Sequence, residues 1–213
     1  MTDPNLLLLA AGWALYGLLH SLLAAPRCKD WMARRMPGLR PWYRLAYNAF
    51  ALLSALPLLW LIAIGDGPML IQWTGAWHWP ARVIALIGGV GLLISFGAYD
   101  LVEFIGLRQW RAGAAANVHD EGEFRIGFCN RYVRHPWYFF SLLILWTQDM
   151  NAALLISAVA ITIYLVIGSR LEEHKLIAAH GATYRRYMAR VPGLFPVPWK
   201  HLTAAEAAEL TRR

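Results

Sequence analysis

Long apolar runs separated by short polar stretches dominate the chain. Five of them stand out, at residues 6–25, 45–64, 83–105, 138–146 and 152–168. The first three have the roughly twenty residues that an α-helix needs to cross the hydrocarbon core of a bilayer. The polar turn Asp149-Met150-Asn151 separates the short fourth run from the fifth, which predicts a helical hairpin. The pattern therefore predicts an all-α, polytopic membrane protein with about five transmembrane helices.

The chain becomes more polar beyond the fifth run but keeps a helical pattern. Residues 172–190 repeat apolar side chains at helical spacing, and Gly181 interrupts them. The segment VPGLFPVP at residues 191–198 is not expected to be helical, because each proline also restricts the residue before it. Residues 203–213 predict a short exposed helix.

Composition supports a membrane protein and suggests its orientation. Of the 213 residues, 58% are hydrophobic and only 15% are charged, whereas roughly a quarter are charged in soluble domains. If the N-terminus lies outside, 19 of the 20 Lys and Arg residues fall on the cytoplasmic side and only Arg82 lies outside. We therefore expect an inner-membrane protein of a bacterium with a cytoplasmic C-terminus. The net charge of +7 reflects loops that face anionic lipid, so membrane lipid is the expected partner, with neither nucleic acid nor an obligate protein partner.

Several isolated polar residues allow two interpretations. Cys28 and Cys129 both fall on the predicted inner side, so neither a disulfide nor a metal site is expected. Cys129 lies near Arg131 and Arg134, which would favour a nucleophilic thiolate as an alternative to simple packing. His20 is either a ligand of haem or metal or, more simply, a packing residue near a helix end.

Two polar clusters flank the predicted hairpin. RHPWY (Arg134 to Tyr138) precedes it, and Glu172-Glu173 follow it. Pro136 suits the first turn of a helix, where a missing amide donor has no cost. His135 lies 15 residues before Met150 and Glu172 lies 22 residues after it, so helical arms would differ by about 10 Å. This predicts a pocket of polar groups staggered over about 10 Å, with His135 deeper in the membrane and residues 110–133 folded against the hairpin.

The third apolar run ends with two further acidic residues. Asp100 and Glu103 are three residues apart, so a continuous helix would place them on one face near its inner end. Ionisable residues at such a depth are candidates for catalysis. The alternative is that they are hydrated or pair with Arg108.

The two clusters together resemble a known superfamily of integral-membrane methyltransferases, the isoprenylcysteine carboxyl methyltransferase type. The resemblance rests on RYVRHPWY at residues 131–138 and LEEHKLIAAHGATYRRYMARVP at residues 171–192. GLRQ at residues 106–109 is similar to the bacterial branch that includes methanethiol S-methyltransferases. LLHSLLA (18–24) and YRLAYN (43–48) resemble the NnrU group of membrane proteins.

This resemblance implies S-adenosylmethionine as cofactor, contacted by His135, Pro136, Tyr138 and Glu172, with Glu173 beside them. It also ties Arg170 to the acceptor. It implies one domain over residues 1–213, with three transmembrane helices in 1–106 and a cofactor loop, the hairpin and a C-terminal cap in 107–213.

The chemistry of the residues fits such a cofactor. Arg134 and His135 suit its carboxylate, the two glutamates suit its ammonium or ribose hydroxyls, and Trp137 or Tyr138 suits its sulfonium. A carboxylate acceptor needs no base, whereas a thiol or amine acceptor can use one, for which the candidates are Asp100, Glu103 and His119.

We therefore expect methyl transfer to a small or lipophilic thiol, carboxylate or amine at the inner membrane interface. One alternative is a redox or isomerase protein of the NnrU or sterol-reductase kind that uses haem or NADPH, because RHPxY also occurs in membrane sterol reductases. Another is a scaffold without catalytic activity, in which the polar residues only cap helices.

Overall fold

The computed structural model describes residues 4–97, 100–115 and 124–212. Helices make up nearly all of its regular structure, as the apolar pattern predicted, and an isolated antiparallel bridge joins Val197 and Lys200. The chain forms two compact units, and each combines segments that are distant in sequence. The first contains Met1–Leu70, Asp100–Asp120 and Met150–Ile161, and the second contains Ile71–Tyr99, Glu121–Asp149 and Thr162–Arg213.

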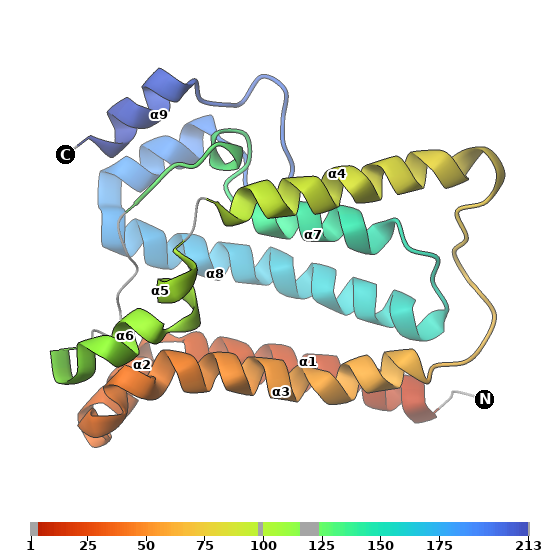
Figure 1. Cartoon of the computed structure of the whole chain (residues 1–213), viewed down its shortest axis with the longest axis horizontal. Coiled ribbons are helices and arrows are strands. Elements are labelled where there is room, and N and C mark those ends of the chain that lie inside the picture. Colours follow the sequence, from red (N-terminus) through yellow and green to blue (C-terminus); the bar gives the residue numbers. More distant parts are fainter. Residues whose placement is uncertain (1–3, 98–99, 116–123, 213) are drawn as a thin grey trace. The chain divides into compact units, whose positions relative to one another are not determined.

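The first unit is built on two long antiparallel helices. Helix α1 (Pro4–Ala24) and helix α3 (Tyr43–Ala63) run side by side (Figure 1). Gly12 permits their close approach, because a Cβ there would lie 2.5 Å from Leu58 Cδ2. Leu9, Leu58 and Ala153 form the buried core of this unit.

Shorter elements complete the first unit. Helix α2 (Pro26–Arg35) and the 3₁₀ helix η1 (Pro37–Trp42) connect α1 to α3. The short helices α5 (Leu101–Ile105) and α6 (Leu107–Ala112) follow, and then the 3₁₀ turn η3 (Gly113–Ala115). The side-chain amide of Asn48 on α3 donates to the carbonyls of Phe104 (3.0 Å) and Ile105 (2.9 Å), which attaches α5 to α3.

The second unit contains the predicted hairpin region. Its elements are η2 (Gly75–Trp77), α4 (His78–Phe96), η4 (Cys129–Arg131), α7 (Pro136–Trp146), the later part of α8 (Ala152–Arg190) and α9 (Ala204–Thr211). Helices α4 and α7 lie side by side (Figure 1). A Cβ on Gly91 of α4 would lie 2.2 Å from the Phe140 ring of α7, so glycine is needed for this packing. Trp146 Nε1 donates to Thr162 Oγ1 (2.9 Å) and joins α7 to α8.

The C-terminal part of the chain has the predicted features. Gly181 interrupts α8 with φ 55° and ψ −125°, a conformation that glycine adopts readily. The proline-rich residues 191–198 are not helical. Thr203 then caps α9 in a reciprocal capping box with Glu206. Tyr184, Tyr187 and Val191 pack with Leu202 and Ala207 into a second buried core.

In the part of the chain that the structure describes, four segments are long and apolar enough to cross a membrane: Pro4–Ala24, Pro37–Ala63, Gly75–Phe96 and Ala152–Arg190. Helix α7 is apolar but shorter, with 11 residues. Most of the apolar surface of these helices is exposed, which suits hydrocarbon rather than water as the surroundings. The protein is therefore an integral membrane protein of all-α fold.

One predicted helix is wrong in its extent. The apolar run at 83–105 does not form a single helix, because α4 ends at Phe96 and a separate helix α5 begins after Asp100. Asp100 has extended backbone angles, and its side chain accepts from the Glu103 backbone N–H (3.1 Å) as a helix N-cap. Asp100 and Glu103 therefore belong to a cap and a short helix instead of one face of the third long helix.

Candidate active site

The site begins where the C-terminal segment holds the start of α7 in place. His135 is the N-cap of α7, and the fully buried Pro136 occupies its first turn as predicted. The backbone N–H of Arg134 donates to Pro192 O (2.9 Å), and that of His135 donates to Gly193 O (3.1 Å). Pro192 and Gly193, each 58 positions after its partner, therefore fix the backbone of the RHP motif.

Glu173 lies at the centre of a buried charged network. Its Oε1 accepts from Arg134 Nε (2.8 Å), Arg134 Nη2 (2.6 Å) and His135 Nε2 (3.0 Å). The exposed fractions of the three side chains are 11% for Arg134, 12% for Glu173 and 5% for His135. The network therefore joins the beginning of α7 to the later part of α8 in a place that excludes most water.

Arg134 also holds the end of α8. Its Nη1 donates to the carbonyls of Met188 (3.2 Å) and Val191. Gly193 leaves room for this guanidinium, because a Cβ there would lie 3.3 Å from Arg134 Nη2. All three guanidinium nitrogens therefore donate to protein groups. Arg134 would have to break some of these hydrogen bonds in order to bind a ligand carboxylate.

Glu172 has a different environment from its neighbour Glu173. Its side chain is 47% exposed, accepts from the Tyr138 hydroxyl (3.1 Å) and lies 3.4 Å from His135 Nδ1. The His135 and Tyr138 rings stack, with centroids 5.3 Å apart and planes 8° apart. Glu172 therefore presents a solvent-accessible carboxylate beside a stacked pair of rings.

The two carboxylates favour the protonated form of His135. Burial of the imidazole opposes its charge, but hydrogen bonds and charges from Glu172 and Glu173 outweigh this effect and raise the pKa of His135 above its ordinary value. Because both ring nitrogens face a carboxylate, the imidazolium can donate on both sides. The cluster then contains two positive and two negative groups.

Two further residues support the motif and were not predicted from the sequence. The Tyr187 hydroxyl donates to Asn130 O (2.6 Å), and Asn130 Nδ2 donates to Arg134 O (3.2 Å). Tyr187 lies within the stretch at residues 171–192 that carries the family resemblance, and on an apolar face of a helix that the periodicity predicted. Asn130 lies just before the stretch at residues 131–138.

The structure brings together five of the predicted cofactor-binding residues: Arg134, His135, Tyr138, Glu172 and Glu173. Trp137 packs instead against Phe96 of α4, with ring centroids 4.6 Å apart. Arg170 is exposed on α8, and its carbonyl accepts from His174 Nδ1 (2.7 Å). Roles for Trp137, Pro136 and Arg170 in binding remain predictions.

Asp100 and Glu103 pair with Arg108, as one of the two interpretations predicted. Arg108 contacts Asp100, and Arg108 Nη1 lies 3.5 Å from Glu103 Oε2. The hydrogen bond from the Glu103 backbone lowers the pKa of the Asp100 carboxyl most, and Arg108 lowers it further. A carboxyl with a lowered pKa is a weak proton acceptor, which favours the structural interpretation of Asp100. His119 lies outside the described residues.

The predicted stagger between the hairpin arms is wrong. His135 and Glu172 are in contact, at 3.4 Å, and are not separated by about 10 Å. The reason lies in the turn at residues 147–151, which is not helical. The predicted stagger assumed the helical rise of about 1.5 Å per residue throughout both arms, and the non-helical turn does not follow this rise.

His20 and the cysteines have packing partners. The Tyr47 hydroxyl lies 2.8 Å from His20 Nε2 and 2.9 Å from Nδ1, and the His20 ring lies between Tyr16 and Tyr47. Tyr43 Oη donates to Cys28 Sγ (3.7 Å), and Cys129 is buried in η4. These contacts support the packing interpretation of His20. No cluster of three potential metal ligands occurs within residues 4–97, 100–115 and 124–212.

Comparison with known proteins identifies the family. The chain is 33% identical over 203 residues to methanethiol S-methyltransferase 2 of Bradyrhizobium diazoefficiens, which covers 90% of this chain and 72% of the relative. The chain belongs to this methyltransferase family. It is also 29% identical to methanethiol S-methyltransferases of Crocosphaera subtropica (85% of this chain, 71% of the relative) and Mycobacterium tuberculosis (92% and 79%).

Membership of this family supports methyl transfer as the activity and a membrane location. It does not favour the redox or isomerase alternative. No family model matches the chain, and no solved structure matches it significantly. The likeness to isoprenylcysteine carboxyl methyltransferases and to the NnrU group stays a prediction.

Proposed function

We propose that the protein transfers a methyl group from S-adenosylmethionine to a small thiol at the cytoplasmic edge of the membrane. The observation that carries this proposal is the convergence of His135, Tyr138 and the accessible Glu172 beside a buried Arg134–Glu173 pair. The relatives are named for methanethiol, so small alkyl thiols are the acceptors to test first. The topology with an external N-terminus is part of the same proposal.

The accessible groups fit the chemistry of the proposed donor, which has an ammonium, a carboxylate, a sulfonium and ribose hydroxyls. Glu172 can accept from the ammonium or from a ribose hydroxyl. The face of Tyr138 can attract the sulfonium by a cation–π interaction of about 0.5–2 kcal/mol. Both ring nitrogens of His135 face carboxylates of the protein, so binding of the donor carboxylate by His135 would require Nδ1 to leave Glu172.

Arg134 and Glu173 have a different role in this proposal from the one predicted. Their side chains bind each other and the end of α8, so we assign them to positioning His135 and Glu172 instead of contacting the donor. A rigid frame of this kind matters because methyl transfer is a direct displacement. The acceptor thiol loses its proton to water, its sulfur bonds to the methyl carbon as the carbon–sulfonium bond breaks, and S-adenosylhomocysteine leaves. Alignment supplies much of the rate. No covalent nucleophile is needed, so Cys129 has no role in the step.

The test is calorimetric binding of S-adenosylmethionine and S-adenosylhomocysteine to the purified chain, followed by transfer of a radiolabelled methyl group to methanethiol. Glu172→Gln should weaken binding of both ligands, and Tyr138→Leu should weaken binding of S-adenosylmethionine more than binding of S-adenosylhomocysteine, which has no sulfonium. The control is Glu209→Gln, which removes the same charge from an exposed position on α9. Folded protein that binds neither ligand, or Glu172→Gln protein that binds both as well as the parent does, would overturn the proposal.

A further inference from the structure

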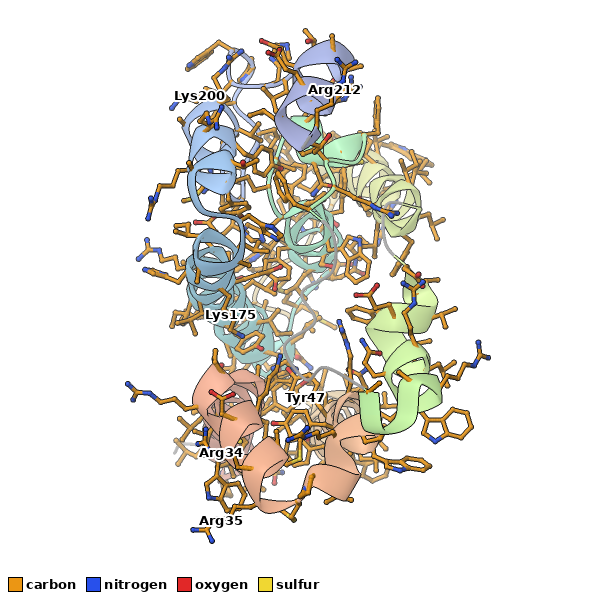
Figure 2. All side chains as sticks on the ribbon, turned by 90° about the vertical axis from the view of Figure 1, so that its left-hand side faces the viewer. Arg34, Arg35, Tyr47, Lys175, Lys200 and Arg212 are labelled. Carbon is orange, nitrogen blue, oxygen red and sulfur yellow. The ribbon has the colours of Figure 1, made fainter. Side chains whose placement is uncertain are left out.

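The connection between α1 and α3 forms a basic and aromatic surface at one membrane edge. Both helices are candidates to cross the membrane, so the α2–η1 segment between them lies at the level of the lipid headgroups. Residues 26–44 contain six Lys or Arg residues and one acidic residue, Asp30. Arg34 and Arg35 are exposed and project outward from α2 (Figure 2).

Three tryptophans accompany these arginines. Trp31 of α2, Trp42 of η1 and Trp110 of α6 are each exposed over about half of their surface, at 54%, 50% and 44%. The Trp42 and Trp110 rings meet edge to face, with centroids 5.8 Å apart. Exposed tryptophans in soluble surroundings are costly, but the indole ring is favoured at the boundary between headgroups and acyl chains.

The surface is built on a fixed support. Met32 and Pro41 are buried beneath it. Arg40 donates to Ala33 O through Nε (3.1 Å) and Nη2 (2.9 Å), which ties η1 to α2. The backbone that carries Trp31, Arg34, Arg35 and Trp42 is therefore held in one arrangement.

We propose that this surface binds the headgroup of an anionic phospholipid. We call it the headgroup surface and define it by Trp31, Arg34, Arg35, Trp42 and Trp110. The arginines bind the negative phosphate, while the indole rings contact the glycerol and upper acyl region. Charge complementarity selects an anionic lipid over a zwitterionic one, because roughly 1 kcal/mol, or about 5-fold in affinity, is gained per basic residue near such a surface.

The experiment compares phosphatidylglycerol with phosphatidylcholine of the same acyl chains, added to the full chain in a neutral detergent. Bound lipid is counted by native mass spectrometry, and stabilisation is measured as the shift in unfolding temperature. Phosphatidylglycerol should bind more tightly and lose affinity as salt is raised. The double variant Arg34→Gln, Arg35→Gln should weaken it about 25-fold, the product of two 5-fold effects.

Matched variants separate a site from a general charge effect. Arg185→Gln, Arg186→Gln removes two adjacent exposed arginines from α8 and should leave phosphatidylglycerol affinity unchanged. Arg34→Lys, Arg35→Lys retains the charge and should restore most of the binding. Equal binding of the two lipids, or equal losses from the two arginine pairs, would overturn the proposal. The proposal would also be overturned if a polypeptide co-purified with the parent protein but not with the Arg34→Gln, Arg35→Gln variant, while the variant still bound lipid.

Discussion

Glu172 and Glu173 are adjacent and chemically identical, yet the structure predicts opposite effects when each is changed to glutamine. Glu173 Oε1 accepts three hydrogen bonds from cationic groups, and its side chain is 12% exposed. Removing one partner of a buried ion pair costs about 3–5 kcal/mol, because the other charge is left without compensation. Glu173→Gln keeps a carbonyl oxygen, and Arg134 keeps its bonds to backbone carbonyls, so we expect a loss of stability near the lower limit, about 3 kcal/mol.

Glu172→Gln should have a small effect on stability. Its side chain is 47% exposed, so solvent screens its interaction with His135, and we expect less than about 1 kcal/mol. Its effect on binding of S-adenosylmethionine should be large, since it removes the accessible carboxylate. The expected pattern is therefore one variant that is unstable and one that is stable but binds poorly.

The assay is unfolding of each purified variant by a denaturing detergent in mixed micelles, followed by calorimetric titration with S-adenosylhomocysteine under conditions where both variants are folded. The Glu209→Gln variant serves as the charge control. The reasoning is refuted if Glu173→Gln is as stable as the parent protein, or if Glu172→Gln is the less stable of the two.

Three further predictions follow from the structure. The pKa of His135 is higher in the folded protein than in the unfolded chain, where it is about 6.5. The protonated imidazole therefore contributes its full stabilisation below about pH 6.5, and this stabilisation is lost as pH rises through the pKa of the folded state. In a series of buffers of increasing pH, His135→Gln should flatten this part of the profile of unfolding free energy against pH. Gly106→Ala should destabilise the protein by more than about 1 kcal/mol, because φ is 102° and a Cβ would lie 2.9 Å from Leu45 N, whereas Gly38→Ala, with no atom within 4 Å, should have little effect on the unfolding midpoint. A reporter that is active only in the cytoplasm should be active when fused after the C-terminus. An inactive fusion, with activity of a second reporter that works only in the periplasm at the same position, would reverse the proposed topology.

Some features of the fold could be predicted because their signals are local. A proline in the first turn, the glycine at 181, the proline-rich segment and the apolar runs each act through a few neighbouring residues. The break between α4 and α5 also had a local signal, an aspartate followed three residues later by a glutamate, which is typical of a helix start. The apolar run on both sides of it suggested a longer helix, and the capping hydrogen bond of Asp100 decided otherwise.

The sequence by itself determined the class of protein, the approximate extent of the long helices, and the two polar clusters that are in contact. Only the tertiary structure decided which residue of each cluster is buried. Adjacent residues on a helix differ by about 100° in direction, and packing against α7 and the 191–193 segment places Glu173 inside and Glu172 outside. The same packing directs the N–H donors of Arg134 to acceptors in the protein. The sequence does not reveal these hydrogen bonds, because the carbonyl acceptors lie 54 and 57 residues further along the chain.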